Sequence, residues 1–242
     1  MPTHAQILPL VFDKVSYVAK GARLVDEFSV TLDPGTRTII LGPNGAGKSL
    51  VLRLSHGLLQ PTSGAIRWEG PGGGNKASLH QAMVFQRPMT LRRSVGANLD
   101  YVLSLRKVPR ELRRAKAAEA LKRAGLFAMR SRPARVLSAG EQQKLALGRA
   151  WVMEPEVLFL DEPTASLDPA ATREVENMIN AIHEAGTKII MTTHDLGQAR
   201  RLADDIIFMH QGRLIERAGA EEFFEHPRTP HAEAFLNGEL LP

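Results

Sequence analysis

The stretch GPNGAGKS, Gly42–Ser49, determines how the rest of the chain is interpreted. It matches the pattern G-x-x-x-x-G-K-[S/T] at every fixed position, between the apolar run Thr36–Leu41 and a helical pattern that starts at Lys48. Glycines let backbone N–H groups wrap a phosphate, while a lysine neutralises the β- and γ-phosphates and a serine can bind Mg²⁺. The alternative, an ordinary glycine turn, does not explain this context. The expected phosphate loop comprises Gly42, Pro43, Asn44, Gly45, Ala46, Gly47, Lys48 and Ser49.

A second stretch, VLFLDEPTASLD (Val157–Asp168), supplies the carboxylates that such a loop needs. Four apolar residues end in Asp161 and Glu162, at the carboxyl end of an expected buried strand, where open α/β sheets bind ligands. We expect Asp161 to hold Mg²⁺ and Glu162 to act as general base on the attacking water. The alternative is a solvated strand end. The chemistry predicted is phosphoryl transfer from a nucleoside triphosphate to water; a kinase would need an acceptor site, and the sequence offers none.

Strand and helix patterns alternate on both sides of a long helical stretch. β-rich segments at 6–18, 22–35 and 63–70 precede or flank the loop and its helix at 48–59, and a loop is expected over Gly70–Lys76. Strand patterns at 81–85, 156–163 and 187–195 alternate with helices at 170–186 and 196–203, before a hairpin at 205–219. The segment 94–151 is helical, with one helix ending at Gly125. This alternation predicts a mainly parallel α/β sheet with an inserted helical subdomain.

Composition limits the function classes. The 242 residues contain no cysteine, which excludes disulfides and thiolate metal sites. No apolar run approaches the roughly 20 residues of a membrane helix, and the N-terminus is a poor signal peptide. The formal charge of +5 is uneven: Arg87–Arg135 holds 14 Lys/Arg and 3 Asp/Glu, a net of +11 against −6 elsewhere. Three interpretations of that segment are open: a solvated helical face, a surface near an anionic membrane, or a nucleic-acid site. It has few aromatic residues on which bases could stack, which argues against binding of single-stranded nucleic acid.

The stretch LSAGEQQKLALGRAW, Leu137–Trp151, is a second candidate anion site. A small polar turn, Ser138-Ala139-Gly140, opens a helical pattern and exposes backbone N–H groups at a helix N-terminus. A chain that already has a phosphate loop does not need this second site for the same ligand.

Together, GPNGAGKS, the lone glutamine of VFQRP, LSAGEQQ, VLFLDEPTASLD and MTTHD resemble the ATP-binding cassette of ABC transporters over nearly the whole chain. This resemblance implies a P-loop NTPase core with helices on both faces of its sheet, an N-terminal antiparallel β subdomain and an inserted helical signature subdomain. It implies one ABC ATPase domain over 1–242, with the core in 1–86 and 155–242 and the helical subdomain in 87–154. The implied cofactors are ATP and Mg²⁺.

The resemblance also implies individual roles. Tyr17 would stack on adenine, although a half-buried strand tyrosine is the alternative, and Gln86 would contact Mg²⁺ and the hinge of the helical subdomain. His194 would read the γ-phosphate. Asp168 would cross to a second subunit in a loop with Ser166 and Leu167. The signature LSAGEQQ would complete the ATP site of that second subunit, so that each chain carries half of two sites. The implied catalytic residues are Lys48, Gln86, Glu162 and His194; the implied metal ligands are Ser49, Gln86 and Asp161; further nucleotide contacts are Leu50, Ser138, Gly140, Glu141 and Asp168.

Some positions depart from the family pattern. Ala139 replaces a glycine of the signature, which is tolerable only if its φ is negative. Glu141 stands where glutamine is commonest, Lys144 replaces an arginine, and Leu50 replaces a threonine. None of these changes removes a group that does chemistry, so we expect an active ATPase.

The resemblance further implies partners. With no expected membrane span, a transport role requires separate transmembrane permease subunits, a second copy of the chain and, indirectly, a substrate-binding protein, on the cytoplasmic face of the inner membrane. The stretches VFQRPMTLRRSV and GRLIERAGAEEFFEHP are similar to cassettes that import oxyanions such as tungstate, molybdate and phosphate, of which we favour tungstate. An exporter energiser remains an alternative. A repair or chromosome ATPase would need a long coiled-coil insertion, and translation-factor cassettes come in pairs, so nucleic acid is not an expected partner.

Overall fold

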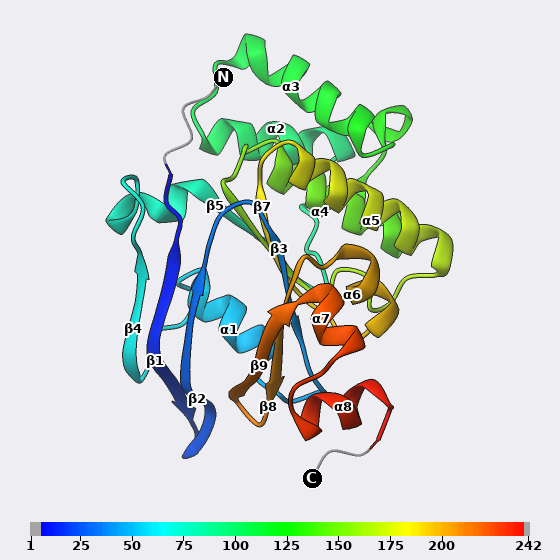
Figure 1. Cartoon of the computed structure of the whole chain (residues 1–242). Helices are drawn as coiled ribbons and strands as arrows, with labels where there is room; N and C mark the ends of the chain where they lie inside the picture. Colours follow the sequence, from blue (N-terminus) through cyan, green and yellow to red (C-terminus); the bar gives the residue numbers. More distant parts are fainter. Residues whose placement is uncertain (1–5, 240–242) are drawn as a thin grey trace.

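Two β-sheets form the framework of the molecule (Figure 1). The structure, a computed structural model, describes residues 6–239. The larger sheet has the strand order β5-β6-β7-β3-β8-β9, and the smaller has the order β2-β1-β4. The strands are β1 (Leu10–Ala19), β2 (Ala22–Leu32), β3 (Arg37–Leu41), β4 (Ser63–Trp68), β5 (Gln81–Val84), β6 (Val157–Asp161), β7 (Lys188–Thr192), β8 (Asp205–His210) and β9 (Arg213–Gly219).

The larger sheet is parallel except for β9, which forms the predicted hairpin with β8. Every residue of β6 and β7 is buried, as expected for strands that helices cover on both faces. In the register of the sheet, Thr192 pairs with both Asp161 and Ile40. The carboxyl ends of β3, β6 and β7 therefore meet at one edge, which places the end of the phosphate strand beside the predicted carboxylates.

The smaller sheet is antiparallel, which confirms the predicted N-terminal β subdomain. Helix α1 (Lys48–Ser55) lies between this sheet and the larger one (Figure 1). Its buried side chains Val51 and Leu52 belong to the same core as Phe12 and Phe28, whose rings meet edge to face at a centroid distance of 5.2 Å. The core between the two sheets thus fixes the helix that begins in the phosphate loop.

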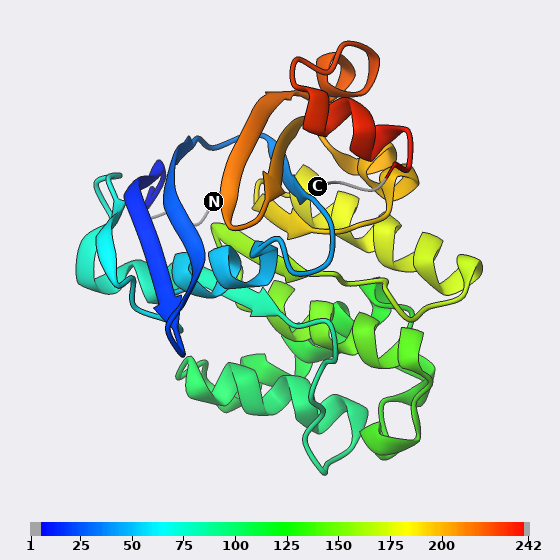
Figure 2. The same cartoon turned by 90° about the horizontal axis from the view of Figure 1, so that it is seen from below.

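Helices fill the stretch between β5 and β6, as predicted. They are α2 (Val95–Leu105), α3 (Arg110–Arg123) and α4 (Ala139–Trp151), and α3 is followed by Gly125 in the left-handed region at φ 67°. Leu99 and Leu145 share one core with Leu160 of the larger sheet. Figure 2 shows these helices and the C-terminal elements on opposite sides of the central strands.

The structure differs from the sequence predictions in two places. The glycine-rich segment 70–76 was expected to be a flexible loop, but a 3-10 helix covers Gly74–His80, and a Cβ at Gly70 would lie 1.9 Å from the carbonyl oxygen of Gln6. Gly70 and Gly73 thus permit close backbone packing, since a Cβ at Gly73 would lie 2.1 Å from the carbonyl oxygen of Trp68. Two further helices, α7 (Ala220–Glu225) and α8 (Pro230–Leu236), follow the hairpin and were not predicted. They are short, and Phe223 of α7 is buried against Phe208 of β8.

The remaining helices, α5 (Pro169–Glu184) and α6 (Leu196–Leu202), begin directly after the carboxylate stretch and after His194. Across residues 6–239, no helix is both long enough and apolar enough to cross a membrane.

Candidate functional site

The phosphate loop is held in place by close backbone contacts that only glycine permits. Gly42 has φ 149°, and a Cβ there would lie 2.2 Å from the carbonyl oxygen of Met209 in β8. Gly47 has φ 96°, and its Cβ would lie 2.9 Å from the carbonyl oxygen of Leu24 in β2. Gly47 is also the N-cap of α1, and the first N–H groups of a helix lack a carbonyl partner one turn earlier. The loop therefore presents these donors at a fixed position, as an anion site requires.

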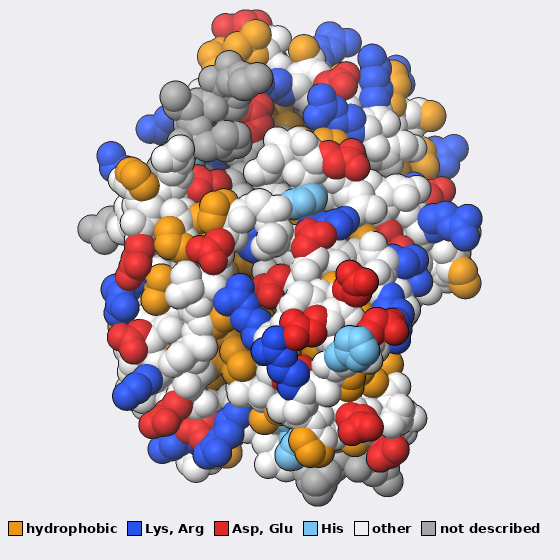
Figure 3. All heavy atoms as spheres, in the orientation of Figure 1, with side chains coloured by type: hydrophobic (Ala, Val, Ile, Leu, Met, Phe, Trp, Pro, Cys, Tyr) orange, Lys and Arg blue, Asp and Glu red, His pale blue; other side chains and the backbone are white. Residues whose placement is uncertain are grey.

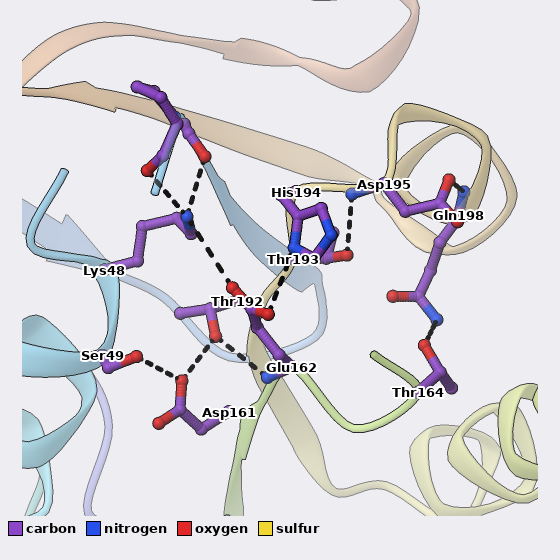
Figure 4. Close-up of polar contacts among 12 residues, drawn as sticks. Lys48, Ser49, Asp161, Glu162, Thr164, Thr192, Thr193, His194, Asp195 and Gln198 are labelled. Carbon is purple, nitrogen blue, oxygen red and sulfur yellow. Dashed lines mark hydrogen bonds and ion pairs between the residues drawn. The ribbon is translucent and has the colours of Figure 1, made fainter. Parts of the chain in front are cut away.

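Lys48 lies inside this loop with its side chain only 5% exposed. Its ammonium donates hydrogen bonds to the carbonyl oxygens of Gly42 at 2.7 Å and Pro43 at 3.0 Å, and Nζ lies 3.8 Å from Oε1 of Glu162 (Figure 4). Burial lowers the pKa of Lys48, and the charges of Glu162 and Asp161 partly oppose this shift. A desolvated cation that is bound mainly to carbonyl oxygens attracts phosphate oxygens strongly.

Asp161 closes the second part of the site. Ser49 donates a hydrogen bond to Oδ1 of Asp161 at 2.6 Å, and Thr192 donates to the same oxygen at 2.9 Å. Hydroxyl and carboxylate oxygens are of the type that Mg²⁺ prefers, and this ion usually takes one or two protein ligands and completes its shell with water and phosphate. Over residues 6–239, no group of three His, Cys, Asp or Glu could hold a metal without such help. The donor set therefore fits a cation that arrives with a nucleotide.

Glu162 occupies the space between Lys48 and His194. Its Oε1 faces Lys48, while Oε2 lies 3.1 Å from Nδ1 of His194 (Figure 4). Its backbone is in the left-handed region at φ 44°, and its N–H contacts both the carbonyl oxygen and the hydroxyl of Thr192 at 3.1 Å. The side chain of Glu162 is 14% exposed and that of His194 is 49% exposed. A carboxylate in this position can accept a proton from a water molecule that reaches it from the open side.

The N-terminus of α4 begins at the predicted polar turn and forms a capping box. The Ser138 hydroxyl accepts a hydrogen bond from the N–H of Glu141, whose carboxylate accepts one from the N–H of Ser138. Ala139 is the first helical residue and is not among the residues with positive φ, so its methyl group is tolerated. Gly140 is required by packing, because a Cβ there would lie 2.8 Å from Cβ of Ala171 in α5.

Comparison with known proteins gives the family. The family model described as ABC transporter matches residues 25–165, more than half of the chain. This chain belongs to the ABC transporter family. It is therefore an ABC-type ATPase subunit.

Individual relatives agree with this assignment. The phosphate import ATP-binding protein PstB 2 of Natronomonas pharaonis is 34% identical over 243 residues, covering 94% of this chain and 86% of the relative. The tungstate uptake system ATP-binding protein TupC of Peptoclostridium acidaminophilum is 36% identical over 200 residues, covering 82% and 93%. The solved structure of cbiO1 from Clostridium perfringens, part of the ABC transporter complex cbiONQ, matches with a TM-score of 0.80 at 30% identity and 90% coverage of each chain.

Hydrogen bonds connect some of the predicted site residues but not others. The structure connects Lys48, Ser49, Asp161, Glu162 and His194 through the contacts described above. Other predicted residues have no side-chain hydrogen bond to that network within 6–239, Glu141 among them, and four of these lie in separate places. Tyr17 is half-buried on β1 opposite Val25, and Gln86 is exposed after β5. Ser138 lies at the start of α4, and Asp168 caps α5 by accepting hydrogen bonds from the N–H groups of Ala170 and Ala171.

Sequence reasoning missed Thr192. Its hydroxyl contacts both the Asp161 carboxylate and the Glu162 N–H, so one residue of β7 orients both acids. The available signal was its position at the carboxyl end of a parallel strand, two residues before His194. That signal identifies the correct edge of the sheet but not the contact.

An apolar groove lies beside Gln86 on the ABC subunit. Its volume is about 400 Å³, and it runs between the segment after β5 and helix α4. Phe85 is 41% exposed and Met89 is 86% exposed, and Arg149 of α4 donates a hydrogen bond to the carbonyl oxygen of Met89 at 2.7 Å. The hydrogen bond from Arg149 therefore holds the segment that carries Met89, and the exposed side chains of Phe85 and Met89 make the rim of the groove apolar.

Proposed function

We propose that this ABC subunit binds MgATP at residues 42–50 and hydrolyses it with Glu162 as the general base. The observation that carries the proposal is the Glu162 carboxylate, held between Lys48 and His194 and next to the Ser49–Asp161 pair. Lys48 and the N–H groups at the start of α1 would bind the β- and γ-phosphates. Ser49 and Asp161, with Gln86 from the neighbouring segment, would hold Mg²⁺, which neutralises phosphate charge when bound.

In this proposal, each remaining residue has a defined task. Glu162 accepts the proton of the attacking water, and His194 orients that carboxylate and contacts the γ-phosphate. Tyr17 stacks on the adenine. The decisive experiment is phosphate release by the purified protein and by Glu162→Gln, which preserves shape and removes the base. Equal rates in the two proteins would contradict the proposed role of Glu162.

A second copy of the chain would complete the site. Ser138, Gly140 and Glu141 lie at the N-terminus of α4, where Ser138 is exposed, and no side-chain hydrogen bond within residues 6–239 connects them to the phosphate loop. Placed against the ATP of a partner in a C2 pair, this N-terminus would supply the missing donors, and Asp168 would cross between the copies. The pair would hold two ATP molecules, each read by both chains.

The groove beside Gln86 is the proposed contact for a membrane permease subunit. Its exposed Phe85 and Met89 give an apolar surface that a partner helix could cover. Residues 87–154 would act as one helical subdomain that moves relative to the core in 1–86 and 155–242. Gln86, at the junction, would connect that movement to the nucleotide.

The basic segment supports a peripheral position at the cytoplasmic face of the inner membrane. Lys and Arg side chains gather at the upper edge of the molecule, over α3 (Figure 3). Five exposed arginines lie on two stretches joined by hydrogen bonds from Val95 N–H to the Arg132 carbonyl and from Ala134 N–H to the Arg93 carbonyl. These arginines are Arg92, Arg93, Arg130, Arg132 and Arg135. Each such charge gains about 1 kcal/mol near an anionic leaflet.

The proposed direction of transport is import, with tungstate as the favoured solute. The support is the similarity to a tungstate uptake protein at 36% identity; the phosphate import relative, at 34% identity over more of the chain, favours phosphate as the second candidate. Reconstitution with the permease and substrate-binding protein encoded beside this chain would decide between them. Stimulation of ATP hydrolysis by phosphate, and not by tungstate, would overturn the preference.

A further inference from the structure

A second buried network lies behind Glu162, centred on Gln198 of α6. Gln198 is fully buried, and its Nε2 donates to the hydroxyl of Thr164 at 2.7 Å and to Oε1 of Glu176 at 3.2 Å. Glu176, on α5, accepts two further hydrogen bonds from the guanidinium of Arg201. Figure 4 shows Gln198 reaching from its helix to Thr164, two residues after Glu162.

These contacts close a ring that contains two of the predicted catalytic side chains, Glu162 and His194. From Glu162 the chain passes through Pro163 to Thr164, whose hydroxyl meets Gln198. The backbone N–H of Gln198 donates to the α6 N-cap Asp195, which directly follows His194, and His194 returns to the Glu162 carboxylate. Every link is a covalent bond or a hydrogen bond of 3.1 Å or less, so α6 is connected to Glu162 from two sides.

The backbone of Glu162 explains why such a ring is needed. A non-glycine residue at φ 44° is uncommon, and at a functional site such a backbone is held by its surroundings. Thr192 holds Glu162 on its N-terminal side, through the N–H. On the C-terminal side, the first side-chain restraint is Thr164 with Gln198, and the stiff Pro163 transmits it to Glu162.

Stability alone does not account for glutamine at position 198. Its Oε1 is buried and makes no hydrogen bond within the described residues, and a buried unpaired acceptor is unfavourable. A leucine would avoid the unpaired oxygen but would leave the Thr164 hydroxyl without this partner and the buried Glu176 with Arg201 alone. What leucine lacks is the amide N–H₂ that contacts Thr164 and Glu176 together.

We propose that Gln198 is a positioning residue that orients the general base through Thr164. It touches neither nucleotide nor water, and it acts by fixing the peptide segment that carries Glu162. The inference rests on the role proposed above for Glu162. It adds a residue of α6 to the machinery of hydrolysis and connects that helix to the segment leading into Asp168.

Steady-state ATP hydrolysis by four variants tests this inference. Gln198→Leu and Thr164→Val each remove one partner, whereas Thr164→Ser keeps the hydroxyl and Arg200→Gln changes an exposed residue of the same helix as a control. We expect kcat to fall about tenfold in the first two, because a small misplacement of a reacting group is costly. KM for ATP should change by less than about twofold, since nucleotide contacts are intact. Thr164→Ser and Arg200→Gln should retain kcat.

The double variant Gln198→Leu/Thr164→Val separates positioning from general destabilisation. If both residues act through one contact, its kcat equals that of either single variant. Independent, multiplying losses would overturn the inference, and so would an unchanged kcat in Gln198→Leu. Equal damage in Thr164→Ser and Thr164→Val, with lowered melting temperatures, would identify a merely structural role. Measuring Glu162→Gln alongside keeps the two proposals apart: full activity there overturns the role of Glu162, and this inference with it.

Discussion

The phosphate loop and the N-terminus of α4 both offer backbone N–H groups to an anion, yet one chain finishes only the first. At the loop, buried Lys48 at the start of α1 meets the carboxylates of Asp161 and Glu162 at the end of β6. At α4, the Ser138 hydroxyl is exposed and turned to its own helix as a cap. The difference shows that a helix N-terminus becomes a phosphate site only when other elements bring charge to it. In the proposed pair, a second copy of the chain would bring that charge to α4.

The largest expected effect comes from breaking the finished region. Lys48→Ala removes the cation that faces the phosphates, so ATP affinity should fall about a hundredfold and turnover should disappear. Equilibrium binding of a fluorescent ATP analogue and phosphate release measure the two effects. Because Lys48 also holds two loop carbonyls, Lys48→Arg serves as the charged control; equal ATPase rates in Lys48→Ala and wild type would contradict the assignment.

Breaking the unfinished region should leave nucleotide binding intact. Ser138→Arg places a bulky charge where we expect the partner's γ-phosphate, so the variant should bind ATP, remain monomeric and lose activity about a hundredfold or more. Glu162→Gln, in contrast, should bind ATP and dimerise without hydrolysing it. Light scattering with MgATP measures both states. If Glu162→Gln stayed monomeric and Ser138→Arg kept full activity, the signature LSAGEQQ would serve only as a helix cap and the proposed second site would be wrong.

A smaller effect tests whether α4 is fixed as tightly as the loop. Gly140→Ala brings a methyl group within 2.8 Å of Ala171 and should destabilise the protein by about 1–3 kcal/mol. Gly148→Ala, on the same helix, meets its neighbours at 3.8 Å and should stabilise by about 0.5–1 kcal/mol. Thermal denaturation of both variants gives the comparison. Identical shifts in the melting temperature of the two variants would show that α4 and α5 can move apart to accommodate the added methyl group without a cost in stability.

The smallest effect is a pH dependence that only the loop should show. Burial lowers the pKa of Lys48, so its charge is lost at a lower pH than that of a free lysine. The alkaline limb of kcat/KM for ATP should therefore begin below pH 10.5, where an ordinary lysine titrates, with activity falling as pH rises. Lys48→Arg should abolish this alkaline fall in kcat/KM, because arginine stays protonated. The N-terminus of α4 offers a serine hydroxyl rather than a lysine, so we expect no such pH dependence from it. A limb that persists unchanged in Lys48→Arg would assign it to another group.

The sequence predicted the parts of this molecule that follow from local pattern. The buried run before Asp161 and the glycines before Lys48 defined a strand, a loop and a helix, and the order of strands and helices predicted the parallel sheet. It did not identify Thr192, because contact across neighbouring parallel strands depends on register. The role of Gln198 was equally hidden, since LGQARRLA reads as an ordinary surface helix until α5 covers it.

Errors arose where tertiary packing overrides composition. Gly70 was predicted to be flexible, yet the backbone of Gln6 lies directly against it. The short helices α7 and α8 carry little helical periodicity of their own, and burial of Phe223 against β8 stabilises the first of them. Local signals could not reveal either contact.

The position of β3 in the sheet has a consequence for how the protein acquires its activity. This strand lies between β7 and β8, which follow it by more than a hundred residues, so the loop finds its carboxylates only after distant segments have paired. Contacts of such sequence separation form slowly compared with helices. We therefore expect nucleotide affinity to be gained late in folding, so that a nascent chain with the complete loop motif should not bind ATP until β6 and β7 have been synthesised and paired.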